Sequence, residues 1–276
     1  MPHRLQTTIS DALWAAIQER ARQLGQSPRQ VVQDALAEAL DIAHHSMFQV
    51  STSGALVEGL YQGAITVGHL RRHGDTGLGT FEDLDGELIM VDGHCYQARS
   101  DGSVIETSDD MLTPFATVVP FVADETHALT GITSYDDLTQ RLDALRTTDN
   151  DFIAYRITGT CSTLVVRSAC RHASGTPLVE AVADQAVFDF ADIPVTIVGF
   201  WSPAYAQAVA IPGFHLHCVS DDRAHAGHVF DLSADRLVVE MHRVTDLHLA
   251  LPETPEFLSA HLSGSAGDMD AVERPR

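Results

Sequence analysis

Four histidines lie close together in the stretch PGFHLHCVSDDRAHAGHVF, residues 212–230. In FHLHCV, the period of two of a β-strand would point His215 and His217 to one side and Cys218 to the other. The following SDDRAHAG is rich in turn formers, so HVFDL can return beside the first strand and bring His228 close to the pair. Three neutral imidazoles with an open fourth position are the ligand set of a catalytic zinc site. The spacing therefore predicts a Zn²⁺ site.

These histidines could also have no metal-binding role. The chain contains 15 histidines, so an HxH pair can arise without a ligand, and such a pair often lies at the surface or in a hydrogen-bonded core. His225 falls inside the expected turn and is left out of the ligand set. Cys218 is expected to face away from the two imidazoles, so it is a poor candidate for a fourth ligand.

The chain has no lysine, because all 17 basic residues are arginines. Schiff-base catalysis and pyridoxal phosphate anchoring need a lysine amine, and the usual phosphate loop places a lysine on its nucleotide. These mechanisms are excluded for this chain acting alone. If the protein performs carbonyl or decarboxylation chemistry, a metal ion is the plainest electron sink.

Two charged residues stand in apolar strand-like runs. Glu87 begins the run ELIMV, and burial there would favour the protonated form that can deliver a proton. Arg167 lies within TLVVRSA, where a buried guanidinium needs a carboxylate from the protein or from a substrate. A structural salt bridge is the alternative to a substrate-binding role for Arg167.

Composition restricts the class of protein. The chain has 276 residues and a net charge of -21, which argues against nucleic-acid or membrane-surface binding by most of it. The sequence shows neither a signal peptide nor a membrane span. Its 4 cysteines form no CxxC pair and are expected to be buried thiols. We therefore expect a cytoplasmic protein.

The elements that must position these residues are mostly strands. Short alternating or apolar runs follow one another from about residue 47, among them ELIMVDG, CYQAR, ATVVPFV, FIAYRITG, TLVVRSA, VTIVGFW, FHLHCV, HVFDL and RLVVEMH. One helix is predicted in SYDDLTQRLDAL, with its leucines on one face and acidic residues in its first turn. The pattern predicts a β-rich fold with few helices.

The first 45 residues follow a different pattern. RLQTTIS alternates as a strand does, Ser10 can cap a helix that ends at Gly25, and Ser27 can cap a second helix that reaches Leu40. We expect a separate strand-helix-helix module in residues 1–45, joined by DIAHHSMFQVSTSG to a main domain in residues 46–276.

This module resembles the ribbon-helix-helix family, which implies DNA contact through alternate strand residues, here Arg4, Gln6 and Thr8. Residues 1–40 contain four arginines and four carboxylates, so the module lacks the positive charge that DNA binding needs. The alternative is a helical hairpin that helps to form a dimer of the protein.

Three longer stretches resemble α-acetolactate decarboxylase. They are EGLYQGAITVGHLRRHGDTGLGTFEDLDGELIMVDGHCYQ (58–97), ITGTCSTLVVRSACR (157–171) and GFWSPAYAQAVAIPGFHLHCVSDDRAHAGHVFDL (199–232). The resemblance runs from about residue 50 to the end of the chain. It implies a zinc enzyme of mixed α/β type, with a large β-sheet and an open β-barrel. The implied reaction converts (S)-2-acetolactate to (R)-acetoin and carbon dioxide.

The resemblance also assigns site residues. The zinc histidines of the family match His215, His217 and His228. The other matches are Glu87 in DGEL, Thr80 in GLGTF, the substrate-contacting Arg167, and Glu273 in the C-terminal DMDAVE. In the implied mechanism, zinc stabilises an enediolate, Arg167 orients the substrate, and Glu87 and Glu273 carry protons to one face, which makes the acetoin chiral.

Two alternatives remain from the sequence. A cupin-like metalloenzyme also uses HxH and a distant histidine, but its pattern wants a glutamate a few residues after HxH, where this chain has CVSDD. The second alternative is a DNA-binding regulator whose ligand-sensing domain has a decarboxylase fold. Retention of the three histidines with Arg167 and Glu87 argues against a dead site.

Overall fold

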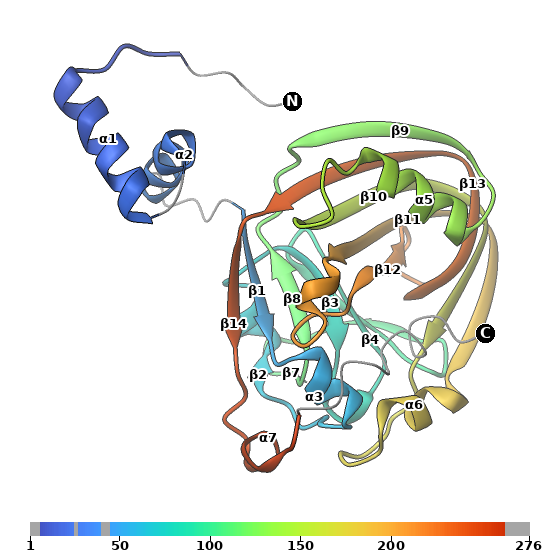
Figure 1. Cartoon of the computed structure of the whole chain (residues 1–276). Coiled ribbons are helices and arrows are strands. Elements are labelled where there is room, and N and C mark those ends of the chain that lie inside the picture. Colours follow the sequence, from blue (N-terminus) through green and yellow to red (C-terminus); the bar gives the residue numbers. More distant parts are fainter. Residues whose placement is uncertain (1–5, 25–26, 40–44, 263–276) are drawn as a thin grey trace.

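The computed structural model describes residues 6–24, 27–39 and 45–262 (Figure 1). Within these ranges the protein is built mainly from strands, which form a seven-stranded sheet, a five-stranded sheet and a two-stranded ribbon. This confirms the predicted β-rich fold of mixed helices and strands. No helix in the described part of the chain is long and apolar enough to cross a membrane.

The seven-stranded sheet has the order β14-β1-β8-β3-β4-β5-β6. Its edge pair β1 and β14 is parallel, and its other neighbours are antiparallel. The strands are β1 (Ser46–Val50), β3 (Thr76–Thr80), β4 (Glu87–Val91), β5 (His94–Ala98), β6 (Val104–Glu106), β8 (Ala116–Val119) and β14 (Asp246–Ala250). The ribbon pairs β2 (Ile65–Thr66) with β7 (Leu112–Thr113).

The five-stranded sheet curls into a small barrel. It contains β9 (Glu125–Ile132), β10 (Phe152–Ser168), β11 (Ala186–Ser202), β12 (Gly213–Ser220) and β13 (Ala226–Val244). Strands β10 to β13 close a ring, because β10 pairs with β11 on one side and with β13 on the other. β12 joins β13 through three residue pairs only, and β9 pairs with β13 further along.

The barrel packs against one face of the seven-stranded sheet. Buried side chains of β4 and β5 meet those of β11, β12 and β13 in one cluster, formed by Ile89, Val91, Tyr96, Ala98, Val198, Val219 and Ala226. Burial of this apolar surface stabilises the contact between the two sheets. Side chains at the ends of β3 and β4 are thereby brought to the barrel strands that carry the histidines.

Short helices connect the strands. They are α3 (Ser53–Val57), α4 (Val67–Leu70), η1 (Glu82–Leu84), α6 (Leu178–Ala181), η2 (Val182–Asp184), η3 (Ala204–Ala206) and α7 (Pro255–Ser259). The longer helix α5 (Tyr135–Leu145) confirms the prediction for this segment. Ser134 caps its first turn by accepting from Asp137 N, and Leu138 and Leu142 are buried against the barrel.

The predicted helices near the N-terminus form as α1 (Asp11–Leu24) and α2 (Pro28–Ala39). Ser10 Oγ accepts from Leu13 N at 3.3 Å, as expected for an N-cap. The predicted strand is wrong for residues 6–10, which adopt no strand, while Arg4 lies outside the described residues. A strand needs a hydrogen-bonding neighbour, and this single chain supplies none at residues 6–10.

Candidate active site

The β12–β13 hairpin places the three predicted histidines together. Its register pairs His217 with His228, and His215 lies two residues earlier on the same face of β12. His225 lies in the turn, where its ring contacts Phe190 with centroids 4.4 Å apart. The expected hairpin is thus formed, and the turn histidine points to a different neighbour.

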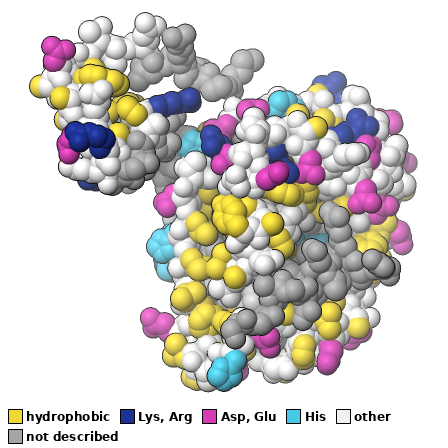
Figure 2. Space-filling view, in the orientation of Figure 1, with side chains coloured by type: hydrophobic (Ala, Val, Ile, Leu, Met, Phe, Trp, Pro, Cys, Tyr) yellow, Lys and Arg dark blue, Asp and Glu magenta, His cyan; other side chains and the backbone are white. Residues whose placement is uncertain are grey.

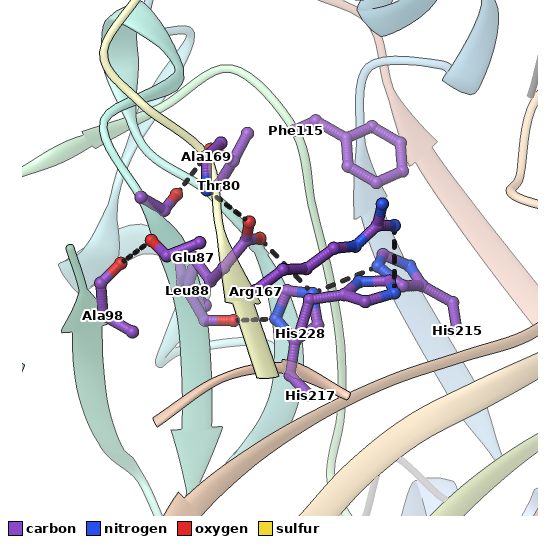
Figure 3. A network of polar contacts seen from close by, with 12 residues as sticks. Thr80, Glu87, Leu88, Ala98, Phe115, Arg167, Ala169, His215, His217 and His228 are labelled. Carbon is purple, nitrogen blue, oxygen red and sulfur yellow. Dashed lines mark hydrogen bonds and ion pairs between the residues drawn. The ribbon is translucent and has the colours of Figure 1, made fainter. Parts of the chain in front are cut away.

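The three imidazoles converge in the interior (Figure 3). Their exposed fractions are 8% for His215, 1% for His217 and 5% for His228. One nitrogen of each ring lies within 4.8 Å of the others, and His215 Nε2 is 3.1 Å from His217 Nε2. Two nitrogens bound to one tetrahedral zinc ion would be about 3.3 Å apart, given bonds of about 2.0 to 2.1 Å. The donor set therefore fits a zinc ion.

A backbone carbonyl from the other sheet orients His217. The ring atom Nδ1 lies 2.9 Å from Leu88 O on β4 and donates to it. This contact fixes the proton on Nδ1, so the lone pair of Nε2 points toward His215. Metal-binding histidines commonly use the second ring nitrogen in this way. The packing of the two sheets therefore sets the tautomer of a candidate ligand.

Burial keeps the three imidazoles neutral. It lowers the pKa of His215 to about 3, with a further contribution from the nearby Arg167 charge. The pKa values of His217 and His228 are also well below the ordinary value of 6.5, chiefly through burial and then through neighbouring histidines and Arg167. Neutral imidazole is the form that binds metal, so the site needs no deprotonation at neutral pH.

Arg167 lies beside the histidines because of strand register. On β10 it pairs with His228 of β13, so both side chains belong to one row across the barrel. Arg167 is 4% exposed, and its Nη2 lies 3.1 Å from His228 Nε2. Its Nη1 donates to Gln185 Oε1 at 3.3 Å. The structure thus brings the predicted arginine into direct contact with one of the three histidines.

The seven-stranded sheet contributes Glu87 and Thr80, which are paired neighbours on β4 and β3. Glu87 Oε1 accepts from Ala169 N at 3.1 Å, and its Oε2 lies 3.5 Å from His217 Nε2. Thr80 Oγ1 donates to Gly86 O at 2.8 Å. Glu87 therefore contacts the histidine cluster and Thr80 lines the same pocket, whereas the predicted Glu273 lies outside the described residues.

These side chains line a pocket of about 460 Å³, part of which is open to solvent. Thr80, Glu87, Arg167, His215 and His228 contribute to its wall. The remainder is mostly apolar and includes Leu56, Leu84, Phe115, Ala169, Leu178, Val182 and Ile211. The sequence did not identify this apolar wall, because such residues look like ordinary core residues until the chain is folded.

A second group of metal-binding residue types lies elsewhere, at His45, Asp124 and His242. Asp124 Oδ2 is 3.7 Å from His45 Nδ1 and 3.9 Å from His242 Nδ1. Each of these ring nitrogens, however, faces a carbonyl oxygen, Arg243 O at 2.5 Å and Val122 O at 2.8 Å. The two Nδ1 atoms therefore act as hydrogen-bond donors to the backbone, and hydrogen bonding accounts for their positions.

Comparison with known proteins agrees with the site. A family model for alpha-acetolactate decarboxylase matches residues 47–264. The enzyme of Lactococcus lactis subsp. cremoris is 38% identical over 230 residues, which cover 82% of this chain and 98% of that enzyme. The enzyme of Methanosarcina mazei is 36% identical over 230 residues, which cover 83% of this chain and 80% of that enzyme. The crystal structure of the Bacillus subtilis strain 168 enzyme has a TM-score of 0.80 at 34% identity, covering 83% of this chain and 99% of that chain. The chain therefore belongs to the α-acetolactate decarboxylase family.

Proposed function

We propose that the protein converts (S)-2-acetolactate to (R)-acetoin and carbon dioxide, with Zn²⁺ held by His215, His217 and His228. The observation that carries this proposal is the convergence of three buried, neutral imidazoles beside Arg167 and Glu87, at a pocket that His215 and His228 help to line. Membership of the decarboxylase family supports the same reaction.

The reaction requires stabilisation of negative charge and delivery of one proton. When carbon dioxide leaves, the electron pair of the broken C–C bond remains on the substrate as an enediolate, and protonation at carbon then gives acetoin. A bound zinc ion would act as a Lewis acid that stabilises this negative charge. The chain's own side chains must orient the substrate and supply the proton.

Arg167 suits the first of these tasks. Its guanidinium is buried in the pocket wall, where Nη1 donates to Gln185 Oε1 and Nη2 lies beside His228. A guanidinium in this position binds a carboxylate with directional, charge-assisted hydrogen bonds. Arg167 therefore orients the substrate carboxylate and balances negative charge in the pocket.

Glu87 suits the second task. Its carboxyl group is fixed by Ala169 N on one oxygen and lies beside His217 on the other. Proton delivery from this side of the pocket reaches one face of the enediolate, which gives one enantiomer of acetoin. We assign the second proton-transferring role to Glu273 on the resemblance of DMDAVE alone. Thr80 borders the pocket next to Glu87.

The apolar wall suits the uncharged part of the substrate. Acetolactate carries two methyl groups besides its carboxylate, hydroxyl and carbonyl oxygens. Side chains such as Leu56, Phe115 and Ile211 can contact these methyl groups and displace water from the site. Lower water content strengthens the electrostatic interactions of Arg167 with the substrate.

The test is release of acetoin from racemic acetolactate by the purified full chain. We expect one acetoin enantiomer, a fall in rate of at least about a hundredfold after chelation, and recovery with Zn²⁺, because metal catalysis of this kind contributes several kcal/mol. Folded, zinc-loaded protein that releases no acetoin would overturn the proposal. An unchanged rate in metal-free protein would overturn the assignment of zinc.

The alternative functions gain no support from the comparisons, which point to neither a cupin-like enzyme nor a DNA-binding regulator. A cytoplasmic location is supported by the four cysteines, which are all free thiols, as expected under reducing conditions. The match to the family model begins at residue 47, which supports a division into a module of residues 1–45 and a catalytic domain of residues 46–276.

We assign dimerisation to the α1–α2 pair. Ala21 and Val31 are buried, while Leu13, Trp14 and Leu36 remain 50%, 45% and 44% exposed. Figure 2 shows such hydrophobic side chains at the surface of this pair. Residues 1–40 have no net charge, so the rest of the chain carries the whole net charge of -21. Two copies of this neutral segment can therefore pack together through their apolar side chains without electrostatic repulsion between them.

Substitution of Leu13 and Trp14 by glutamate is expected to convert a dimer into a monomer, because the two carboxylates would be buried without partners. Mass in solution can be measured by light scattering. The matched control is Leu258→Glu, at an exposed position in α7, which should leave the mass unchanged. A wild-type monomer, or a double variant that stays dimeric, would contradict this role of the helices.

A further inference from the structure

A second cavity lies beside the active-site pocket. It encloses about 250 Å³, part of which is open to solvent. Three residues, Phe115, Ile211 and His215, line both this cavity and the active-site pocket. The side chains of Phe115 and Ile211 therefore form a partition between the two spaces, next to one of the three converging histidines.

The backbone fixes both residues of the partition close to the site. Phe115 directly precedes β8, and its carbonyl oxygen accepts a hydrogen bond from Thr80 N at 3.0 Å. Ile211 lies two residues before β12, the strand that carries His215. Both side chains are buried in one apolar cluster. In Figure 3 the ring of Phe115 lies on the side of the site that holds His215 and the guanidinium of Arg167.

The second cavity can accept an alkyl chain. Besides the partition, its apolar residues are Met47, Leu78, Phe200 and Ala210, and its polar residues are Gln49, Thr117 and Ser202. The amide nitrogen of Gln49 donates to Ser51 O at 2.9 Å and to Val209 O at 2.6 Å. The amide oxygen of Gln49 accepts from Thr117 Oγ1 at 3.3 Å. Because these polar groups already have partners, an apolar chain in the cavity would not leave them unpaired.

The chemistry of the substrate places an alkyl group against the partition. In a 2-hydroxy-3-keto acid, the hydroxyl-bearing carbon and the carbonyl carbon each carry one alkyl group. When these two carbons lie beside the histidines, one of the alkyl groups faces His215 and the adjoining side chains of the partition. A methyl group is the shortest alkyl group at that position. A longer chain would collide with Phe115 or Ile211 before it reached the second cavity.

We propose that Phe115 and Ile211 determine substrate specificity by limiting the length of the alkyl group that faces them. The second cavity is then the space that the site would gain if this partition were removed. The inference rests on the proposed decarboxylation and deepens it. A methylene that a hydrophobic pocket does not accommodate lowers kcat/KM by about 10- to 200-fold, so the effect is large enough to measure.

Leu178 provides a matched control for Ile211. The two side chains are isomers, both are buried in the same apolar cluster, and both line the active-site pocket. Leu178 is, however, not among the residues that line the second cavity. Replacement by alanine removes the same carbon atoms at either position, so I211A and L178A should lower Tm to similar extents. Only I211A should connect the two cavities.

The experiment measures kcat/KM for acetolactate and for two longer isomers, 2-hydroxy-2-propyl-3-oxobutanoate and 2-hydroxy-2-methyl-3-oxohexanoate, with zinc-loaded full-length protein. Wild type is expected to use at least one longer isomer about tenfold less well than acetolactate, or worse. In I211A, the kcat/KM of that isomer relative to acetolactate should rise at least about tenfold, and in L178A it should change by less than about threefold. The isomer that responds identifies the alkyl group that faces the partition.

Binding without turnover gives a second readout. The acids 2-hydroxy-2-methylpropanoate and 2-hydroxy-2-methylpentanoate have no keto group, so the decarboxylation cannot proceed, and calorimetry yields their Kd. The ratio of the two Kd values should shift in favour of the longer acid by at least about tenfold in I211A and by less than about threefold in L178A. F115L repeats both measurements at the other residue of the partition if I211A does not fold.

Three results would overturn the inference while leaving the proposed reaction intact. They are equal use of all three substrates by wild type, unchanged ratios in a folded partition variant, and a gain in L178A as large as that in I211A. The last of these would show that any enlargement of the pocket admits longer chains. Absence of acetolactate turnover by wild type would instead overturn the proposed function, and the inference with it.

Discussion

The variant His217→Ala is expected to lose bound zinc and to release acetoin at least about a thousandfold more slowly than wild type. The substitution removes one of the three converging imidazoles and leaves two, too few for a stable zinc site with an open position. Lewis-acid stabilisation contributes several kcal/mol, and each 1.4 kcal/mol corresponds to about a factor of ten in rate. Metal content after dialysis and kcat/KM are the two measurements.

The matched control for this variant is His225→Ala in the same hairpin. His225 contacts Phe190 in the turn and is not among the three converging imidazoles, so its removal should change neither zinc content nor kcat/KM by more than about twofold. Because His217 also donates to Leu88 O, circular dichroism should confirm that the variant is folded. A folded His217→Ala protein with one zinc per chain and normal turnover would show that the metal lies elsewhere.

Replacement of Glu87 by glutamine is expected to lower kcat by about 10²- to 10⁴-fold, the usual contribution of a positioned general acid or base. The acetoin that still forms should lose enantiomeric purity, because solvent can then protonate either face of the enediolate. Glutamine has nearly the same shape as glutamate and can still accept from Ala169 N. The measurements are kcat and the enantiomeric ratio of the product.

Two further measurements make the Glu87 result specific. Zinc content has to be measured, because the new amide would lie close to His217 Nε2, which is now 3.5 Å from Glu87 Oε2. The loss of rate is assigned to proton transfer only if zinc content equals that of the wild type. Glu106→Gln is the control, since Glu106 forms an exposed contact with His94 at the surface and should not affect turnover. If Glu87→Gln kept the full rate and still released a single acetoin enantiomer, Glu87 would have no role in proton transfer.

Local pattern was enough to predict the histidine hairpin and helix α5. Alternation in FHLHCV and the turn formers after it depend on neighbours in sequence, and the pairing of His217 with His228 follows from that hairpin. The leucine spacing of α5 and its cap at Ser134 are likewise local. Local alternation failed at residues 6–10, because a strand exists only where another strand pairs with it.

The long-range contacts of the site could not be predicted from local pattern. Glu87 and His217 are 130 positions apart in the chain, and packing of the two sheets brings their side chains to 3.5 Å. The Leu88 carbonyl that orients His217 belongs to the backbone, so no residue type marks it. Gln185 reaches Arg167 because a strand ladder ends beside it.

The sequence by itself determined the chemical types in the site. It supplied three histidines at hairpin spacing, an arginine and a glutamate in apolar strands, and no lysine for a covalent alternative. Only the tertiary structure decided which side chains share the pocket, which ring nitrogen of His217 faces its partners, and which apolar residues enclose them. These features depend on strand register and on the packing of two sheets, which bring together residues that are far apart along the chain.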